Sequence, residues 1–378
     1  MTTLQEPTPV ETPPRKARSF QLRGWFSQLP WPARLVIILA VLACGYLLPY
    51  LGDVPVIGPQ IITQGIDWPS ALFNMSYYVL LAVGLNVVVG FAGMLDLGYV
   101  GFFAVGTYTV ALLCSSDSVL HTGWPWLAAV PIAIAVAMVS GLILGWPTLR
   151  LRGDYLAIVT LGFAEIIRIT ADSANFLRGN RGFTDVPHPP GSHSDGSPIF
   201  GVVDATPYFW LGLTVVIIAV LALRNLDRSR VGRSWLAIRE DEEAAELMGV
   251  RTIKYKLWAF AIGAAVGGLG GVMFAGEQGF VNSATFVLQF SILVLGGVVM
   301  GGSGNIPGAI LGGALISYIP DRLRGINDPI FHTDLYQFRF LLFGLAIIII
   351  MIFRPQGLIP SRRRSMELKD RAKEVAPQ

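Results

Sequence analysis

Charge is scarce in this sequence. Asp, Glu, Lys and Arg make up only 14% of the 378 residues, whereas 53% of the residues are hydrophobic. Soluble globular chains carry roughly 25% charged residues, so this composition excludes an ordinary soluble protein and indicates a chain with many membrane spans. The formal net charge of +3 gives no indication of a nucleic-acid partner.

The sequence also lacks the cysteine, histidine and glycine–lysine patterns that disulfide, metal and nucleotide sites require. The two cysteines, Cys44 and Cys114, are too few for a disulfide framework. The four histidines lack the spacing of metal ligands, so we expect no metal site. The sequence has no GxxxxGK(S/T) motif, and none of its five lysines follows a glycine, which excludes a P-loop. We therefore expect a chain that carries no cofactor and does not hydrolyse ATP by itself.

Long apolar segments dominate what is present. They predict an all-α, polytopic membrane protein with about ten transmembrane helices, near residues 33–51, 69–90, 98–115, 125–146, 155–172, 207–224, 257–276, 286–301, 308–320 and 337–353. Residues 1–30, rich in Pro, Thr and Arg, predict a disordered cytoplasmic tail. Residues 31–356 form the transmembrane domain, and residues 357–378 form a C-terminal tail. Most of the 28 Lys and Arg lie in segments that this arrangement keeps inside, which predicts cytoplasmic termini.

The densest group of charges lies in the middle of the chain, at residues 224–256 between two apolar segments. Such a stretch cannot lie in hydrocarbon, so we expect a loop in water. It contains eight basic residues, which predict the cytoplasmic side: Arg224, Arg228, Arg230, Arg233, Arg239, Arg251, Lys254 and Lys256. A short helix is predicted inside it, with Asp241 as N-cap, Glu242 and Glu243 in the first turn, and Gly249 at the C-terminal end.

This short helix has an apolar strip made of Ala244, Ala245, Leu247 and Met248. About two turns are too short to be stable alone, and we expect the loop to offer little surface that buries the strip. Two hypotheses remain open on physical grounds. The helix docks into a groove of another protein, or it lies on the membrane lipid headgroups.

A glycine-rich stretch, Gly90 to Gly98, interrupts the second predicted span and includes Gly93 and Asp96. Each glycine in a helix costs about 1 kcal/mol relative to alanine, so this stretch predicts a break. A carboxylate facing lipid is expensive, so we expect Asp96 to cap the next helix or to face water. Broken helices are also where transporters expose backbone groups to ligands.

Polar residues inside the other predicted spans are candidates for a translocation pathway. Glu165, Arg168 and Asp172 are spaced to share one helical face, which predicts an internally neutralised ion network or a functional site. The six main pathway candidates are Asn86, Gly93, Asp96, Thr160, Glu165 and Asn282, and Gln289 is a further polar residue that could face a pore. Gly263, Gly267 and Gly271, and likewise Gly308 and Gly312, recur every four residues, which predicts close helix contacts, within the chain or with a second subunit.

Glu243-Ala244-Ala245, followed by three residues and Gly249, resembles the EAA loop of ABC importer permeases. Residues 232–271 are similar to branched-chain amino-acid importer permeases, in particular their LivM-type subunits, and the similarity recurs in 86–113, 149–169, 294–316 and 353–360. The resemblance implies a coupling helix formed by Asp241, Glu242, Glu243, Ala244, Ala245, Met248 and Gly249. It also implies two inverted repeats, spans two to five and seven to ten, and a place in the bacterial inner membrane.

The same resemblance implies partners. These are ATP-binding subunits that hydrolyse ATP, a second permease subunit and an extracytoplasmic substrate-binding protein. The expected function is inward transport of branched-chain or related amino acids by ATP-driven alternating access. Similar permeases import urea and short-chain amides, and the quoted segments do not separate the two. A proton-coupled secondary transporter that uses Asp96 or Glu165 is a weaker hypothesis, because it leaves the central loop without a role.

The charge asymmetry generates a test of topology. Single cysteines at Ser194 and Ser365 are expected to lie on opposite sides of the membrane. A membrane-impermeant maleimide should label position 194 in intact cells and position 365 only after permeabilisation. Labelling of both positions from the same side would contradict the predicted arrangement.

Overall fold

The structure is a computed structural model, and it describes residues 30–53, 66–120, 122–148, 153–192, 198–201, 204–324, 335–354 and 357–359. The two predicted tails lie almost wholly outside these residues. The chain divides into two compact units, Met1–Leu48 and Pro49–Gln378. The first unit contains helix α2 (Trp31–Leu47), which has a proline, Pro32, in its first turn. Proline suits this position because a first-turn residue needs no backbone N–H partner within the helix.

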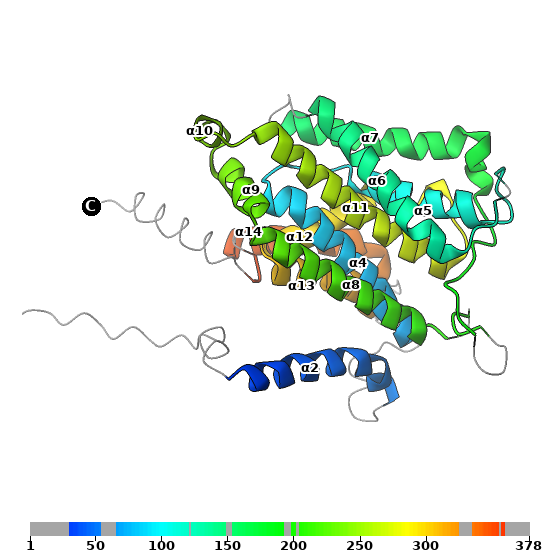
Figure 1. Cartoon of the computed structure of the whole chain (residues 1–378). Helices are drawn as coiled ribbons and strands as arrows, with labels where there is room; N and C mark the ends of the chain where they lie inside the picture. The colour runs from blue at the N-terminus through cyan, green and yellow to red at the C-terminus, as the bar shows by residue number, and fades with distance from the viewer. Residues whose placement is uncertain are drawn as a thin grey trace, which may run out of the picture. The chain divides into compact units, whose positions relative to one another are not determined.

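The second unit is a bundle of α-helices (Figure 1). Its helices are α4 (Trp68–Leu85), α5 (Tyr99–Cys114), α6 (Trp126–Thr148), α7 (Asp154–Ser173), α8 (Thr206–Asp227), α9 (Arg230–Glu240), α10 (Glu242–Leu247), α11 (Thr252–Gln278), α12 (Leu288–Gly301), α13 (Ile306–Arg324) and α14 (Arg339–Phe353). Each predicted span coincides with a helix of the chain. The ninth, predicted as only 308–320, is longer than expected and runs through α13.

Among the described residues, six helical stretches are long and apolar enough to cross a membrane: Trp68–Phe91, Trp126–Thr148, Thr206–Asp227, Thr252–Gln278, Ser283–Gly301 and Tyr336–Phe353. They include α4 and α11, which are mostly buried, and α14, which is largely exposed. An apolar helix that is exposed along its length suits lipid or another membrane subunit rather than water. The described part of the chain is therefore an all-α, polytopic membrane fold.

Helices α4 and α11 form the centre of the bundle. Helix α11 packs against α5, α6 and α4, and α4 packs against α13 and α8. The core is filled by aromatic and aliphatic side chains such as Phe73, Phe103 and Phe260, which are fully buried. The ring of Phe103 stacks on Phe290 of α12, with ring centroids 5.2 Å apart. These contacts join segments that lie far apart in the sequence.

Glycines let these helices approach closely. A Cβ atom at Gly271 would lie 2.7 Å from the backbone nitrogen of Thr107 in α5, and one at Gly263 would lie 2.7 Å from the side chain of Val88. In the second stripe, a Cβ at Gly308 would lie 2.7 Å from the carbonyl oxygen of Gly301. The glycine stripes therefore serve packing within the chain, which confirms the first of the two predicted uses.

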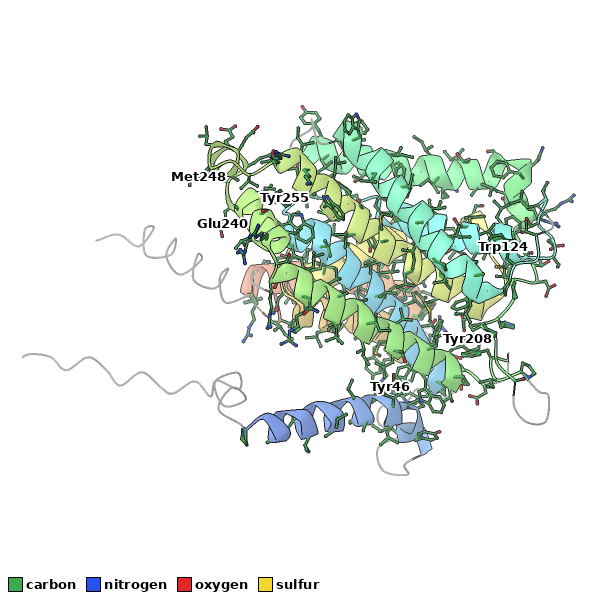
Figure 2. The ribbon with its side chains drawn as sticks, viewed as in Figure 1. Tyr46, Trp124, Tyr208, Glu240, Met248 and Tyr255 are labelled. Atoms are coloured by element: carbon green, nitrogen blue, oxygen red, sulfur yellow. The ribbon has the colours of Figure 1, made fainter. Side chains whose placement is uncertain are left out.

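The bundle has two ends. Figure 2 shows Glu240, Met248 and Tyr255 at one end, here the α10 end, and Trp124 and Tyr208 at the opposite, far end. Helices α4, α6, α8, α12 and α14 run from the far end toward the α10 end, whereas α5, α7, α11 and α13 run the other way.

The close approach of α11 and α5 predicts a strong effect of side-chain size. Gly271→Leu should destabilise the protein by about 1–3 kcal/mol or more, because rigid backbone atoms of α5 occupy the space. The matched control is Gly162→Leu in α7, where no atom lies within 4 Å of an added Cβ. The measurement is size-exclusion chromatography of the detergent-extracted protein after heating. Equal heat resistance of the two variants would contradict this packing.

Candidate functional site

The charged segment 224–256 is mostly helical. Helix α8 continues to Asp227, α9 follows, and α11 already begins at Thr252. Helix α9 was missed as a separate element, although Ser229 is a sequence signal for it. Its hydroxyl accepts a hydrogen bond from the Val231 N–H at 3.1 Å and caps the helix. The buried residues of α9, Gly232, Trp235 and Ile238, share one face.

Helix α10 has the predicted local structure. The Asp241 carboxylate accepts a hydrogen bond from the Ala244 N–H at 3.0 Å, which is an N-cap. At the other end, Gly249 has a φ of 87°, in the left-handed region. The Val250 N–H donates back to the Ala245 carbonyl oxygen at 3.0 Å, which closes the helix. Six residues are thus held in a helix by one cap at each end.

The predicted apolar strip of α10 is divided between one buried residue and several exposed residues. Ala245 is only 5% exposed and contacts its own chain, so it positions the helix and is not available for docking. Our expectation that this strip would find little surface to bury it was wrong for Ala245. Leu247 and Met248 are 89% and 84% exposed, and they form the apolar tip of α10. An ion pair of 2.5 Å between Glu242 and the buried Lys256 of α11 fastens the helix to the bundle.

Arg239, at the end of α9, reaches from this charged segment into the helix break. After α4 the chain makes a π-helix, η2 (Asn86–Phe91), and its Gly90 carbonyl oxygen accepts a hydrogen bond from Arg239 Nη1 at 2.5 Å. A Cβ at Gly93 would lie 2.7 Å from Arg239 Cγ, so only glycine fits beside this side chain. The ring of Phe91 stacks on Trp235, with centroids 6.4 Å apart. Helix α9 therefore packs directly on the break.

Asn86 joins the break to the second half of the chain. Its buried side-chain oxygen accepts a hydrogen bond from the Gly304 N–H at 2.8 Å, in the turn between α12 and α13. Gly304 has a φ of 81°, and a Cβ there would clash with the Arg239 guanidinium. Arg239 and Gly304 were not among the residues predicted for this site, because their proximity depends on long-range packing.

The break itself is closed by side chains from other helices. Thr160 of α7 accepts a hydrogen bond from the Leu97 N–H at 3.0 Å, and Ser291 of α12 accepts one from the Val100 N–H at 2.9 Å. Asp96 is buried and accepts from the Gly98 N–H at 2.9 Å. The N-cap of α5 is Gly98, so Asp96 braces the turn before the helix and is not its N-cap as predicted.

Four of the six predicted pathway residues, Asn86, Gly93, Asp96 and Thr160, are thus gathered at the break, and the other two lie elsewhere. Glu165 of α7 forms an ion pair with Arg168 at 2.5 Å. Asp172 is not in this pair, because its carboxylate accepts a hydrogen bond from the Ser283 hydroxyl at 2.8 Å. The predicted three-residue network is therefore one pair and one separate contact.

Asn282, the sixth predicted pathway residue, lies in the connection between α11 and α12. Its side-chain oxygen accepts a hydrogen bond from the Thr285 hydroxyl at 3.1 Å. A Cβ at Gly182 would lie 3.0 Å from the Asn282 Cβ, so the residue is packed against the far-end loop that follows α7. This contact gives Asn282 a structural setting away from the break.

At the far end, Asp117 fastens the loop after α5 to the loop after α7. Its carboxylate accepts a hydrogen bond from the Thr184 hydroxyl and pairs with Arg178 at 3.4 Å. These contacts, the Thr184 hydrogen bond foremost, hold the pKa of Asp117 below its usual value. Phe183 also forms an isolated β-bridge with Val281. Side-chain and backbone contacts thus join the described parts of the far-end loops.

This geometry defines a class. The chain is a polytopic helical bundle with a buried break after α4, and broken helices of this kind occur in many membrane transporters. Residues 70–351 match the family described as branched-chain amino acid transport system / permease component. The chain belongs to this family of multi-pass membrane permeases.

Sequence identity to known permeases supports this family assignment. The chain is 38% identical over 310 residues to the high-affinity branched-chain amino acid transport system permease protein LivM of Salmonella typhimurium, covering 77% of this chain and 70% of the relative. LivM of Escherichia coli is also 38% identical, over 313 residues, with 78% and 70% covered. The permease protein LivH of Escherichia coli is 26% identical over 297 residues, with 75% and 91% covered.

The pair on α7 generates a prediction. Arg168→Ala should lower the amount of assembled protein more than Glu165→Gln does, because it leaves a carboxylate without its partner on a membrane helix. Asp172→Asn is the matched control, since Asp172 lies outside the pair. Quantitative blotting of membrane fractions measures the effect. Wild-type levels and transport for Arg168→Ala would refute a structural role for the pair.

Proposed function

We propose that this chain is one transmembrane subunit of an ABC importer that moves branched-chain amino acids inward. The observation that carries the proposal is the exposed apolar tip of α10, which is fastened at its base and linked through α9 to the helix break. The identity to LivM, at 38%, supports branched-chain amino acids over urea or short-chain amides as the substrate. Nucleotide hydrolysis belongs to separate ATP-binding subunits.

Helix α10 is the element that docks on an ATP-binding subunit. Leu247 and Met248 are exposed, and their cover by a protein groove removes apolar surface from water. The exposed Glu243 and Ala244 flank this tip, while the buried Ala245 and the Glu242–Lys256 pair hold the helix to its own chain. A firmly held base lets a push on the tip move the bundle rather than bend the loop.

The push then reaches the pathway through α9. Arg239 contacts the Gly90 carbonyl group on the first half of the chain and lies against Gly304 on the second half. Asn86 already joins these two halves. Motion of α9 is thereby coupled to the break, which opens toward one side of the membrane at a time. ATP binding favours one of the two states by its differential affinity for them.

Packing between the two halves supports an inverted repeat of α4–α7 and α11–α14. The first helix of each half packs against the third helix of the other, α4 against α13 and α11 against α6. Ten spans with both termini in the cytoplasm put the α10 end inside and the far end outside. The ordered far-end loops then receive an extracytoplasmic substrate-binding protein. The exposed apolar faces of α7 and α14 suit contact with a second permease subunit.

A backbone substitution tests the docking role of α10. Gly249→Val should strain the left-handed C-terminus by about 1–2 kcal/mol, because a β-branched residue disfavours this φ. Glu243→Lys should also weaken docking by reversing the charge at the positive end of the helix. Both variants are expected to insert normally but to recover less ATP-binding subunit in a pull-down and to lose substrate-stimulated hydrolysis.

The matched control is Gly123→Val, at the far end. Gly123 also has a positive φ of 53°, and no atom lies within 4 Å of an added Cβ at either glycine. This control applies the same kind of backbone strain away from α10 and should leave ATPase binding intact. Normal assembly and transport by Gly249→Val and Glu243→Lys would show that α10 is not the coupling element.

A further inference from the structure

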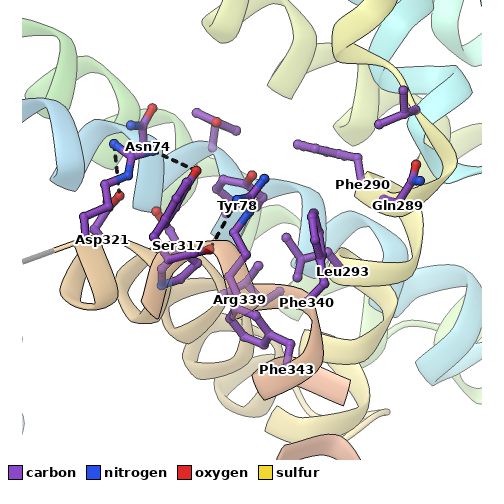
Figure 3. A pocket seen from close by; sticks show the side chains of 16 residues that line it. Asn74, Tyr78, Gln289, Phe290, Leu293, Ser317, Asp321, Arg339, Phe340 and Phe343 are labelled. Carbon is purple, nitrogen blue, oxygen red and sulfur yellow. Dashed lines mark hydrogen bonds and ion pairs between the residues drawn. The ribbon is translucent and has the colours of Figure 1, made fainter. Parts of the chain in front are cut away.

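A cavity of about 260 Å³ lies between α4, α12, α13 and α14 (Figure 3). Of its lining residues, only Gln289 was predicted to face a pore. Charged, aromatic and aliphatic side chains line the cavity, and they come from the three consecutive helices α12, α13 and α14 and from α4, which is distant from them in sequence. Its position away from the break makes it distinct from the residues described above.

The chemistry of the lining changes with depth. Helices α12 and α14 run away from the far end, so Gln289 and Arg339 lie about one turn nearer that end than Leu293 and Phe343. Helix α13 runs in the opposite direction, and its Asp321 therefore lies nearer the far end than its lining residues one turn earlier. The cavity thus has a charged outer part and an apolar inner part.

The outer part presents charges of both signs. The Arg339 guanidinium stacks over Tyr336, 4.2 Å from the ring centroid, and Nη1 donates to the Tyr336 carbonyl oxygen at 3.3 Å. The ion pairs found among the described residues do not include Arg339. Asp321 has a weak pair with Arg324, at 3.8 Å, and is not within pairing distance of Arg339. A ligand with both charges can therefore bind to both residues.

We propose that this cavity binds a branched-chain amino acid as a zwitterion. Arg339 takes the α-carboxylate, Asp321 takes the α-ammonium, and the apolar part around Leu293 and Phe343 takes the side chain. A volume of about 260 Å³ leaves room for a ligand the size of an amino acid. The site rests on the proposed function and adds to it a binding site within this subunit itself.

The N-terminus of α12 supports the same orientation. Val287 is its N-cap and makes no side-chain hydrogen bond to the first turn, and both Val287 and Gln289 line the cavity. The positive end of the helix dipole thus lies at the part of the cavity where Arg339 also favours an anion. A carboxylate bound there interacts with both.

The test is equilibrium binding of radiolabelled leucine to the assembled transporter in lipid nanodiscs, without the substrate-binding protein. Arg339→Gln and Asp321→Asn should each weaken leucine binding about tenfold or more, since each removes a charge-assisted hydrogen bond. Two competitors separate the role of Arg339 from that of Asp321. Isopentylamine, which lacks the carboxylate, should lose no affinity in Arg339→Gln, and 4-methylpentanoate, which lacks the ammonium, should lose none in Asp321→Asn.

Arg322→Gln is the matched control, because it removes a charge next to Asp321 from a residue that does not line the cavity. Wild-type leucine affinity in both cavity variants would overturn the site, as would an equal loss for both competitors in each variant. Uptake of leucine by the complete wild-type transporter distinguishes failure of the cavity site from failure of the proposed function. If wild type imports leucine while the cavity variants bind it normally, only the site fails. If wild type imports no leucine, the proposed function fails.

Discussion

Backbone groups at a helix break within a membrane protein must be satisfied by the protein itself. The break between α4 and α5 meets this constraint by borrowing side chains from elsewhere in the chain, and the rest of the bundle depends on the result. Thr160 of α7 accepts from the Leu97 N–H, Ser291 of α12 accepts from the Val100 N–H, and Arg239 of α9 donates to the Gly90 carbonyl oxygen. In the other direction, the Asn86 side chain of the break accepts from the Gly304 N–H in the turn after α12. One irregular stretch therefore holds helices of both halves of the chain together.

The same constraint explains why the charged central segment is not a loose connector. Arg239 supplies a donor to the break, and Trp235 is fully buried against Phe91, so α9 is part of the packed bundle. Only the tip of α10 projects from it, with Leu247 and Met248 exposed. The segment combines a rigid base with a small apolar tip, which suits a part that receives force from a partner.

Local signals in the sequence were sufficient to predict the helices and the two ends of α10. The cap at Asp241 and the left-handed turn at Gly249 depend on neighbours within a few residues, and both were predicted correctly. Long apolar runs likewise located the helices. Features that depend on distant contacts were not accessible. Asp172 binds Ser283 instead of Arg168, and the cavity beside Arg339 is formed by helices whose arrangement no local pattern encodes.

The contact between α11 and α5 has a mechanical consequence. Where Gly106 of α5 meets Gly268 of α11, the two backbones are in direct contact. Hydrogen bonds from α5 to α11 flank this contact, because the Tyr99 hydroxyl donates to the Gly263 carbonyl oxygen at 2.9 Å and the Thr107 hydroxyl donates to the Gly271 carbonyl oxygen at 3.2 Å. Sliding or separating the two helices would break the close packing and the hydrogen bonds together. The centre of this protein therefore favours motion as one rigid body, with changes of shape confined to the helices around it.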